Sequence, residues 1–375
     1  MKGKKLKLIF KDLQNVHLVK DVGMIPYYMH KNFGYDSEII YLEKKENLIY
    51  KKFVKELKLK PLKRPFYLNT FIYLIKNAKN IDVLMQFHTN PDQIIFSWLY
   101  RLLNKKGIVF VRSDFAENIF EIKKFGLFNL LRRWKTILSL KAVDILIVER
   151  HDMMNFFRKN YNKYMNKIVY MTTCFDDAQA KINLIPFDKK ENLIITIGRL
   201  GTRQKATETI LNAIELIKED LNGWKIMLIG SIKKGFEKRI EKFYKKNPDL
   251  KNKIIFTGNI TERKKLIEIY KKAKIFCFPS RWEGFGLVLP EAGYFGNALV
   301  STKVGGAEDI TDREKYGKLC KVDDILGLAN SLKYYIKNKK ELKKACTGIQ
   351  KYCRENFVWR KAVNNLQKRI LEIKK

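Results

Sequence analysis

The sequence is poor in long apolar runs and in cysteine. No stretch approaches the roughly 20 consecutive apolar residues of a membrane-spanning helix. Four lysines lie among the first seven residues, but only Leu8, Ile9 and Phe10 follow without interruption, which is too short for a signal-peptide core. The five cysteines are odd in number and have no metal-ligand spacing, so we expect reduced thiols in a cytoplasmic protein.

Acidic residues are also few. The chain has 39 Asp and Glu against 76 Lys and Arg, which gives a formal net charge of +37. The excess is spread along the chain, with 34 basic and 17 acidic residues in 1–185 and 42 and 22 in 186–375. Such a charge favours anionic partners: nucleotides, nucleic acid or acidic lipid headgroups. A lysine-rich codon bias would produce the same excess, so charge alone does not choose among them.

Short apolar, β-branched runs alternate with helical patterns along the whole chain. With 375 residues and 46% apolar content, the chain can fold into two domains with cores of their own. Alternating strands and helices predict parallel sheets covered on both faces, and twelve strands exceed one ordinary sheet. We therefore expect an α/β protein with two doubly wound, Rossmann-like domains. The expected strands are 5–10, 38–42, 83–87, 108–111, 145–148, 168–171, 193–197, 226–229, 254–256, 275–278, 298–301 and 318–320.

Polar residues and Pro186 separate two expected strands between positions 176 and 191. We place the first domain at 1–180, the second at 181–358 and a last helix at 359–375 that crosses back to the first domain. Ligands of doubly wound sheets bind beyond the carboxyl ends of the strands. Two such sheets facing each other would form a cleft between the domains, a common place for a ligand site.

Two carboxylates follow the expected strand at 275–278. Glu283 lies in a loop around Phe285, and Glu291 comes directly after Pro290, a residue type that often starts a helix. We expect Glu283 in the strand-to-helix loop and Glu291 in the first helical turn. Acidic side chains beside unpaired backbone N–H groups suit a ligand with hydroxyls and phosphates. The alternative is that both glutamates only cap the helix.

Two cations follow the expected strand at 193–197. Arg199 comes after Gly198, and Lys205 precedes a helix that begins near Thr207. They can converge at a strand end and a helix start, where an arginine fork and a mobile lysine charge could neutralise a diphosphate. In so basic a chain they can equally be two solvated surface cations.

The motifs stand in an order that resembles the donor-binding half of a GT-B glycosyltransferase, of the large retaining group called family 4 (glycosyl transferases group 1). The resemblance covers about residues 192–330. The matching residues are Gly198–Leu200, Lys205 with Glu208, 228–230, 256–260, Tyr270 before Ala273, 278–280, Glu283 with Glu291, Ser301–Thr302 and 305–308.

The resemblance implies roles for these residues. Arg199 and Lys205 would hold the pyrophosphate of a nucleotide-sugar donor and stabilise the leaving nucleoside diphosphate, since fixed cations there favour the transition state. Glu283 would bind hydroxyls of the transferred sugar, and Glu291 those of the ribose. The remaining donor-binding positions are Gly198, the backbone of Phe285, Gly286 and Leu287, and Asn259 and Ile260 near the base.

No general base stands out, which fits a retaining mechanism in which a donor phosphate oxygen takes the proton of the acceptor. The sugar carbon would pass through an oxocarbenium-like state. No Asp-x-Asp motif lies near these residues, so we expect no essential metal ion and no cofactor besides the donor substrate.

The first domain matches the family less tightly. Gly23 lies in a segment expected to form a phosphate-facing loop, where a glycine lets the backbone come close. His88 ends an expected strand and resembles the histidine of the family near the reacting sugar. Asp114 ends the next strand and could orient the acceptor or Arg112. For His88 the alternative is an ordinary hydrogen-bonded histidine.

Two segments of the first domain combine basic and apolar side chains. Residues 121–141 have a broad apolar face with Trp134, flanked by lysines and arginines, and residues 50–79 are rich in lysine and aromatic residues. Residues 121–141 can form a core-covering helix with a solvated basic side. They can also lie on an anionic membrane. A lipid-linked acceptor at the inner face of the plasma membrane would account for both segments.

The leading hypothesis is a retaining glycosyltransferase that uses a UDP- or GDP-sugar in making a surface polysaccharide or glycolipid. Three alternatives remain: a catalytically inactive GT-B accessory or chaperone subunit, a sugar-nucleotide epimerase of the same fold, and a nucleic-acid-binding protein. The last ranks lowest and we expect no nucleic-acid partner, because it is motivated only by charge and no basic helix-turn-helix or aromatic strand platform stands out. The sequence does not identify the base, the sugar, the acceptor or the oligomeric state.

Overall fold

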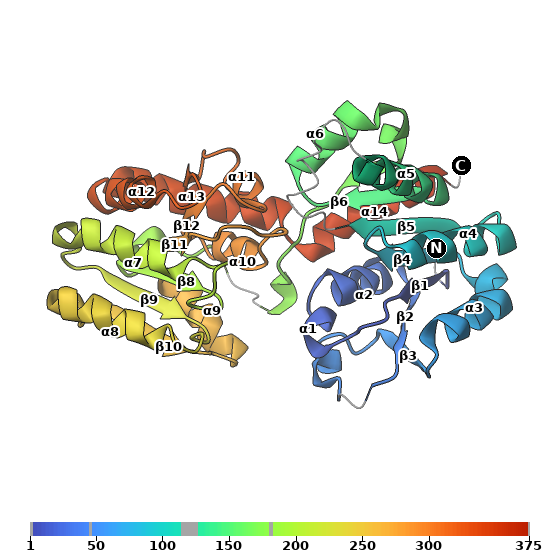
Figure 1. Cartoon of the computed structure of the whole chain (residues 1–375), viewed down its shortest axis with the longest axis horizontal. Helices are drawn as coiled ribbons and strands as arrows, with labels where there is room; N and C mark the ends of the chain where they lie inside the picture. The colour runs from blue at the N-terminus through green and yellow to red at the C-terminus, as the bar shows by residue number, and fades with distance from the viewer. Residues whose placement is uncertain (1–2, 45–46, 114–126, 180–182, 374–375) are drawn as a thin grey trace. The chain divides into compact units, whose positions relative to one another are not determined.

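A computed structural model describes residues 3–44, 47–113, 127–179 and 183–373. Contacts between Cα atoms divide the chain into two compact units (Figure 1). Unit 1 consists of Met1–Asp176 and Trp359–Lys375, and unit 2 of Asp177–Val358. Among the described residues, no helix combines the length and the apolar character needed to cross a bilayer.

Unit 1 contains a seven-stranded parallel sheet in the order β3-β2-β1-β4-β5-β6-β7. All six strands expected in this part of the sequence are present. The seventh strand, β3, was not predicted, because its sequence Lys-Leu-Lys-Pro-Leu lacks the continuous apolar run of a buried strand. It forms the edge of the sheet, where lysine and proline are tolerated. The strands are β1 Lys5–Ile9, β2 Asp36–Leu42, β3 Lys58–Leu62, β4 Val83–Phe87, β5 Ile108–Ser113, β6 Ile145–Val148 and β7 Ile168–Tyr170.

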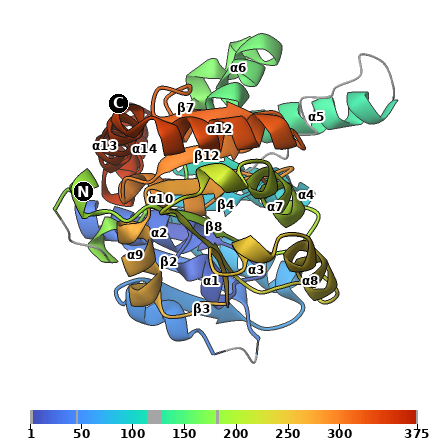
Figure 2. The same ribbon diagram turned by 90° about the vertical axis from the view of Figure 1, so that its left-hand side faces the viewer.

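Helices cover both faces of this sheet, and each face has its own apolar core. Helices α2 and α14 pack on one face, and α3, α4, α5 and α6 on the other (Figure 2). The expected return of the last helix is confirmed, because the Tyr35 hydroxyl after α2 donates to Gln367 Oε1 of α14 at 3.0 Å. The helices are α1 Asn15–Leu18, α2 Asp21–Phe33, α3 Phe66–Asn77, α4 Pro91–Leu103, α5 Leu127–Ala142, α6 His151–Asn160 and α14 Trp359–Ile373.

Unit 2 contains a six-stranded parallel sheet in the order β10-β9-β8-β11-β12-β13, and all six expected strands are present. The strands are β8 Leu193–Ile197, β9 Lys225–Ile229, β10 Ile254–Gly258, β11 Ile275–Phe278, β12 Ala298–Thr302 and β13 Gly317–Cys320. The helices are α7 Thr207–Leu216, α8 Glu237–Lys246, α9 Arg263–Lys272, α10 Val288–Tyr294, α11 Ala307–Ile310, α12 Ile325–Lys337 and α13 Lys339–Asn356. The predicted α/β architecture of two parallel, doubly wound sheets is thus confirmed.

The five cysteines all lie within the described ranges. They are buried, and none is in a disulfide. Burial raises the pKa of the Cys346 thiol to about 11 and that of Cys320 to about 11 as well, so both are neutral apolar side chains near neutral pH.

Candidate functional site

The predicted donor residues of unit 2 gather at one edge of its sheet. Gly198, Arg199 and Lys205 follow β8, and Asn259 and Ile260 follow β10. The loop with Glu283 follows β11, and the glycine pair at 305–306 follows β12. Because the carboxyl ends of parallel strands share one edge, four loops of unit 2 meet where doubly wound sheets bind their ligands.

An ion pair joins two of these loops. The ammonium nitrogen of Lys205 lies 2.5 Å from Oε1 of Glu283. It also lies 4.9 Å from the centre of the Phe278 ring, close enough for a cation–π contact. The side chains of Lys205 and Glu283 are only 17% and 9% exposed. Lys205 is a cation of the kind that binds phosphates, and Glu283 is a carboxylate of the kind that binds hydroxyls. The two therefore lie in contact at a half-buried site.

Glycines make this close approach possible. Gly305 has φ +55°, and a Cβ there would lie 2.9 Å from the Glu283 Cβ and 2.6 Å from the Phe285 oxygen. The N–H of Gly306 donates to that same oxygen at 2.8 Å. A Cβ on Gly198 would come within 3.2 Å of the Lys205 side chain. The 305–306 loop thus fits against the Glu283 loop only without side chains.

Arg199 is exposed and joins the same loops through Gln204. Its guanidinium donates to Gln204 Oε1 at 2.8 Å, and the Gln204 amide donates to the Trp282 oxygen at 3.1 Å. Arg199 is therefore connected to the loop of Glu283 through one intervening side chain.

Arg281 connects the loop after β11 with the loop after β8, and the sequence did not identify it as a site residue. Its Nε lies 2.7 Å from Asp323 Oδ1, one terminal nitrogen lies 2.7 Å from Glu208 Oε1, and the other donates to the Arg203 oxygen at 2.8 Å. Hydrogen bonds to Asp323 and Glu208 raise the pKa of Arg281. The sequence motif contained Glu208 but no signal for its partner, because an arginine in so basic a chain is unremarkable.

Glu291 is held by two side chains. Its Oε1 lies 2.8 Å from an Arg263 nitrogen, and its Oε2 accepts a 2.9 Å hydrogen bond from the Tyr270 hydroxyl. Burial, reinforced by Glu291, raises the pKa of Tyr270, which keeps this phenol protonated as a donor. The expected helix start at Pro290 is two residues late, because α10 already begins at Val288; Glu291 still lies in its first turn.

The other donor-binding candidates have mixed surroundings. Phe285 is buried, Gly286 has φ +92°, and Leu287 is 37% exposed. Asn259 is exposed and Ile260 is half-buried, directly after Gly258 with φ +69°. Among the residues that the structure describes, no group of three or more His, Cys, Asp or Glu side chains is arranged to hold a metal ion.

His88 lies directly after β4 of unit 1 in a strained conformation. Its φ is +60°, a left-handed value that is uncommon for residues with a side chain and that often marks a functional site. Its backbone N–H donates to the Arg112 oxygen at 2.8 Å. His88 also lines a pocket of about 340 Å³, together with Phe10, Asp12, Tyr67 and other residues that follow β1 and begin α3 and α4.

The prediction of a loop at Gly23 is wrong, because this residue lies in the first turn of α2. A Cβ on Gly23 would come 2.2 Å from the Leu18 oxygen, so the glycine allows α1 and α2 to pack closely. Asp114 lies outside the described residues.

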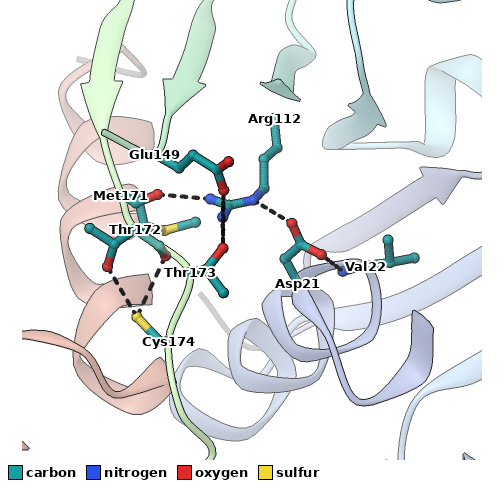
Figure 3. A network of polar contacts seen from close by, with 8 residues as sticks. All are labelled: Asp21, Val22, Arg112, Glu149, Met171, Thr172, Thr173 and Cys174. Atoms are coloured by element: carbon teal, nitrogen blue, oxygen red, sulfur yellow. Dashed lines mark hydrogen bonds and ion pairs between the residues drawn. The ribbon is translucent and has the colours of Figure 1, made fainter. Parts of the chain in front are cut away.

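Arg112 is the centre of a buried polar network in unit 1 (Figure 3). Its Nε lies 2.6 Å from Asp21 Oδ2, and one terminal nitrogen lies 3.1 Å from Glu149 Oε2 and 2.9 Å from Thr173 Oγ1. The other terminal nitrogen donates to the Met171 oxygen at 2.8 Å. Burial opposes the charge of Arg112, but Asp21 and Glu149 raise its pKa. Asp21 and Glu149 were missed, and they hold Arg112 in the way expected of Asp114.

Residues 177–351 match the family model described as "Glycosyl transferases group 1". The chain therefore contains a domain of this family of glycosyltransferases, at residues 177–351. It is 31% identical over 176 residues to a GalNAc-transferase of Campylobacter jejuni that acts on a diNAcBac-PP-undecaprenol glycan, across 46% of each chain. It is 26% identical over 261 residues to the amylovoran biosynthesis glycosyltransferase AmsD of Erwinia amylovora, across 66% of this chain and 67% of the relative.

Solved structures resemble the chain along its whole length. Anabaena Alr3699/HepE in complex with UDP has a TM-score of 0.73 at 14% identity, over 98% of this chain and 100% of the other. A glycosyltransferase from Rickettsia africae has a TM-score of 0.73 at 18% identity, over 100% of this chain and 98% of the other. Together with the two parallel sheets and the returning helix, these likenesses show the GT-B fold.

Proposed function

We propose that the protein is a retaining glycosyltransferase that moves a sugar from a nucleoside diphosphate donor to a glycan or a lipid-linked acceptor. The observation that carries the proposal is the ion pair of Lys205 and Glu283. It brings a cation suited to phosphate and a carboxylate suited to sugar hydroxyls to the carboxyl edge of the unit 2 sheet.

On the donor side, Lys205 and Arg199 would bind the pyrophosphate. Negative charge grows on the phosphate oxygen as the bond to the sugar carbon breaks, and a fixed cation stabilises that charge. Glu283 holds Lys205 in place before the donor arrives. Its second oxygen can accept hydrogen bonds from the sugar, because an ionised carboxylate has about four acceptor sites.

Glu291 would bind the ribose of the donor. Arg263 and Tyr270 contact one oxygen each, which fixes the plane of the carboxylate. Free lone pairs on both oxygens can still accept from two neighbouring hydroxyls. The backbone of Phe285, Gly286 and Leu287, and residues Gly198, Asn259 and Ile260, would complete the donor site.

In the retaining reaction, the bond between the sugar carbon and the donor oxygen breaks, and the acceptor oxygen bonds to the same face of the sugar. The acceptor proton passes to a phosphate oxygen of the departing nucleoside diphosphate. This route needs no protein base. Lys205 beside the leaving group would stabilise the negative charge that develops on the departing nucleoside diphosphate.

The pocket at His88 is our candidate for the acceptor side. It combines aromatic side chains such as Phe10 and Tyr67 with carboxylates such as Asp12 and Asp92, a mixture suited to the apolar faces and hydroxyls of sugars. The strained backbone of His88 supports a functional role. The acceptor-side role of Asp114 and the donor-side role of Gly23 stay predictions.

Relatives and neighbours suggest the substrate class. Alr3699/HepE has been seen with UDP, one relative is named for amylovoran biosynthesis, and another is named for lipopolysaccharide core biosynthesis. We propose a UDP-sugar donor, with a GDP-sugar as the alternative, and an acceptor of a surface polysaccharide or glycolipid. We also propose a cytoplasmic protein that contacts the anionic inner membrane surface through residues within 50–79 and 121–141.

A panel of UDP-, GDP- and dTDP-sugars tests the proposal by nucleotide release with and without lipid-linked glycan acceptors. We expect release that depends on one donor and increases with an acceptor. A donor sugar that changes configuration without nucleotide release would instead indicate an epimerase. No turnover and no donor binding by the folded protein would indicate an inactive accessory subunit.

A further inference from the structure

Helix α4 of unit 1 has a stripe of exposed apolar side chains on its outer face. Ile95, Trp98 and Leu102 are 50%, 45% and 75% exposed and follow one another at spacings of three and four residues. The opposite side of the helix buries Phe96 and Tyr100 in the core. A helix on the surface of a water-soluble unit ordinarily has polar residues on its outer face.

The two helices that pack on α4 repeat this pattern. On α3 the exposed stripe is Leu68, Ile72 and Ile75, and on α5 it is Leu131, Trp134 and Leu138. Contacts of α4 with both α3 and α5 show that the three helices are neighbours, with α4 in contact with each of the other two. The ring of Phe71 in α3 lies 5.3 Å from that of Phe96 in α4, and Ser139 of α5 donates to Gln93 of α4 at 2.9 Å.

We call these nine side chains the α3–α5 surface. Single exposed apolar residues are ordinary, but a contiguous set on neighbouring helices marks an interaction site. In the described part of unit 2 no helix has three exposed large apolar residues; Leu216, Ile255 and Leu326, for example, lie on α7, β10 and α12. The gathering is therefore a property of one face of unit 1.

The charge around the α3–α5 surface is basic. Residues 63–106 contain seven Lys and Arg against two Asp, and residues 127–142 contain four against none. Lys63, Arg64, Lys76, Lys105 and Lys106 are exposed near the ends of α3 and α4. A second copy of the chain would bring like charges together across such a contact. An anionic lipid surface complements both the apolar stripes and the cations.

We propose that the α3–α5 surface lies on an anionic lipid bilayer, with Trp98 and Trp134 at the level of the headgroups. This goes beyond glycosyl transfer, because binding to a bilayer does not require a working donor site. It also refines the membrane contact proposed above, because α3 and α5 lie within or largely within the segments 50–79 and 121–141 and α4 is a third helix. Within 50–79, Phe66 and Tyr73 are buried in the core, and α4 belongs to neither segment.

The location fits an acceptor that stays anchored in lipid. The N-terminal halves of α3 and α4 supply Phe66, Tyr67, Asp92 and Phe96 to the pocket of about 340 Å³ at His88. A bilayer on the outer faces of these helices and a glycan in the pocket would contact the same two helices. The lipid part of such an acceptor need not leave the bilayer.

Flotation with two kinds of vesicle tests the proposal: phosphatidylcholine alone, and phosphatidylcholine mixed equally with phosphatidylglycerol. We expect the protein to float with the anionic vesicles only and to dissociate in high salt. The triple variant Ile95→Ser/Trp98→Ser/Leu102→Ser should bind about tenfold or more weakly. Since these side chains are exposed, the variant should remain folded, which its circular dichroism and melting temperature check.

The matched control is Leu216→Ser/Leu326→Ser, which removes two exposed apolar side chains of unit 2 and should leave flotation unchanged. Equal binding to both kinds of vesicle, or equal binding by the triple variant and the wild type, would overturn the proposal. So would a dimer that the triple variant abolishes, without any flotation, since a second copy would then occupy the surface. Nucleotide release in solution should be the same in the triple variant, so failure here is distinct from failure of the proposed reaction.

Discussion

The ammonium nitrogen of Lys205 and Oε1 of Glu283 lie 2.5 Å apart, although 78 residues separate them in the chain. Their strands, β8 and β11, are neighbours in the unit 2 sheet, so parallel pairing brings the two loops together. The pair is mostly shielded from water, where removing one partner leaves the other charge uncompensated.

Replacing Glu283 by Ala should lower kcat by about a hundred- to a thousandfold while changing the donor KM little. The carboxylate would act on the sugar and on Lys205 most strongly when charge develops in the transition state. Nucleotide release under saturating donor measures this. Glu219→Ala, which removes a side chain that is 89% exposed, is the control and should turn over normally. Unchanged kcat in Glu283→Ala would falsify its role.

Replacing Glu291 by Ala should mainly weaken donor binding. Loss of the hydrogen bonds between a carboxylate and the ribose should raise the donor KM about ten- to a hundredfold, with kcat largely retained. Tyr270→Phe removes only the hydroxyl 2.9 Å from Glu291 and should have a smaller effect in the same direction. Calorimetric titration with the nucleotide alone separates binding from turnover. An equal loss of kcat in both glutamate variants would contradict the division of roles.

The strands were predicted correctly from the sequence because they are buried on both faces of their sheets. Strands buried on both faces are continuous apolar runs, and all twelve runs singled out are strands. The edge strand β3, with Pro61 and two lysines, lacks this signal. The loop expected at Gly23 is a helix because α1 and α2 follow each other directly. Such local packing is invisible in a pattern of apolar residues.

The site was predictable where its residues follow strands in a fixed order. Lys205 and Glu283 were both singled out, and the structure brings them into contact. The partners that hold the site were not found. Asp21 and Glu149 contact Arg112 across 91 and 37 residues, and no spacing in the sequence connects them. Pairings of this kind depend on the tertiary fold.

Replacing Arg112 by Met should lower the free energy of unfolding of unit 1 by about 3–5 kcal/mol, because Asp21 and Glu149 would stay partly buried without their cation. Adding Asp21→Asn and Glu149→Gln should restore part of the loss. Arg101→Met breaks a half-exposed ion pair with Asp144 and should cost less. Calorimetric melting of the three variants checks the order. An Arg112→Met protein as stable as the wild type would show that the network adds nothing.

Replacements of His88 should separate its backbone from its ring. Asparagine tolerates the left-handed conformation, so His88→Asn should keep the stability of unit 1 but lower turnover about tenfold or more if the ring contacts the reacting sugar. A β-branched residue strains this backbone, so His88→Val should also lower the free energy of unfolding by about 1–2 kcal/mol. Melting and nucleotide release together distinguish the two effects. Full turnover in His88→Asn would leave only the backbone role.

Lys190 should make the stability of unit 2 depend on pH. This buried lysine donates to the oxygens of Ala273 and Lys271 at 2.8 and 3.2 Å, at the end of α9. Burial lowers the pKa of Lys190 from 10.5 to about 8. Below pH 8 the lysine is protonated in both the folded and the unfolded chain, and the folded state bears the full cost of the buried charge. Between pH 8 and 10.5 the unfolded chain binds more protons, so the free energy of unfolding rises with pH.

Relative to Lys190→Met, which cannot titrate, the free energy of unfolding of the wild type should rise by about 2 kcal/mol between pH 7 and pH 9.5. Urea unfolding at both values measures the difference. Lys189→Met removes an exposed lysine next to Lys190 and is the matched control; its difference from the wild type should not change with pH. A constant difference for Lys190→Met would mean that the bonds to the α9 carbonyls compensate the burial of the ammonium group. A falling difference would require a pKa raised above 10.5, the opposite of what burial alone produces.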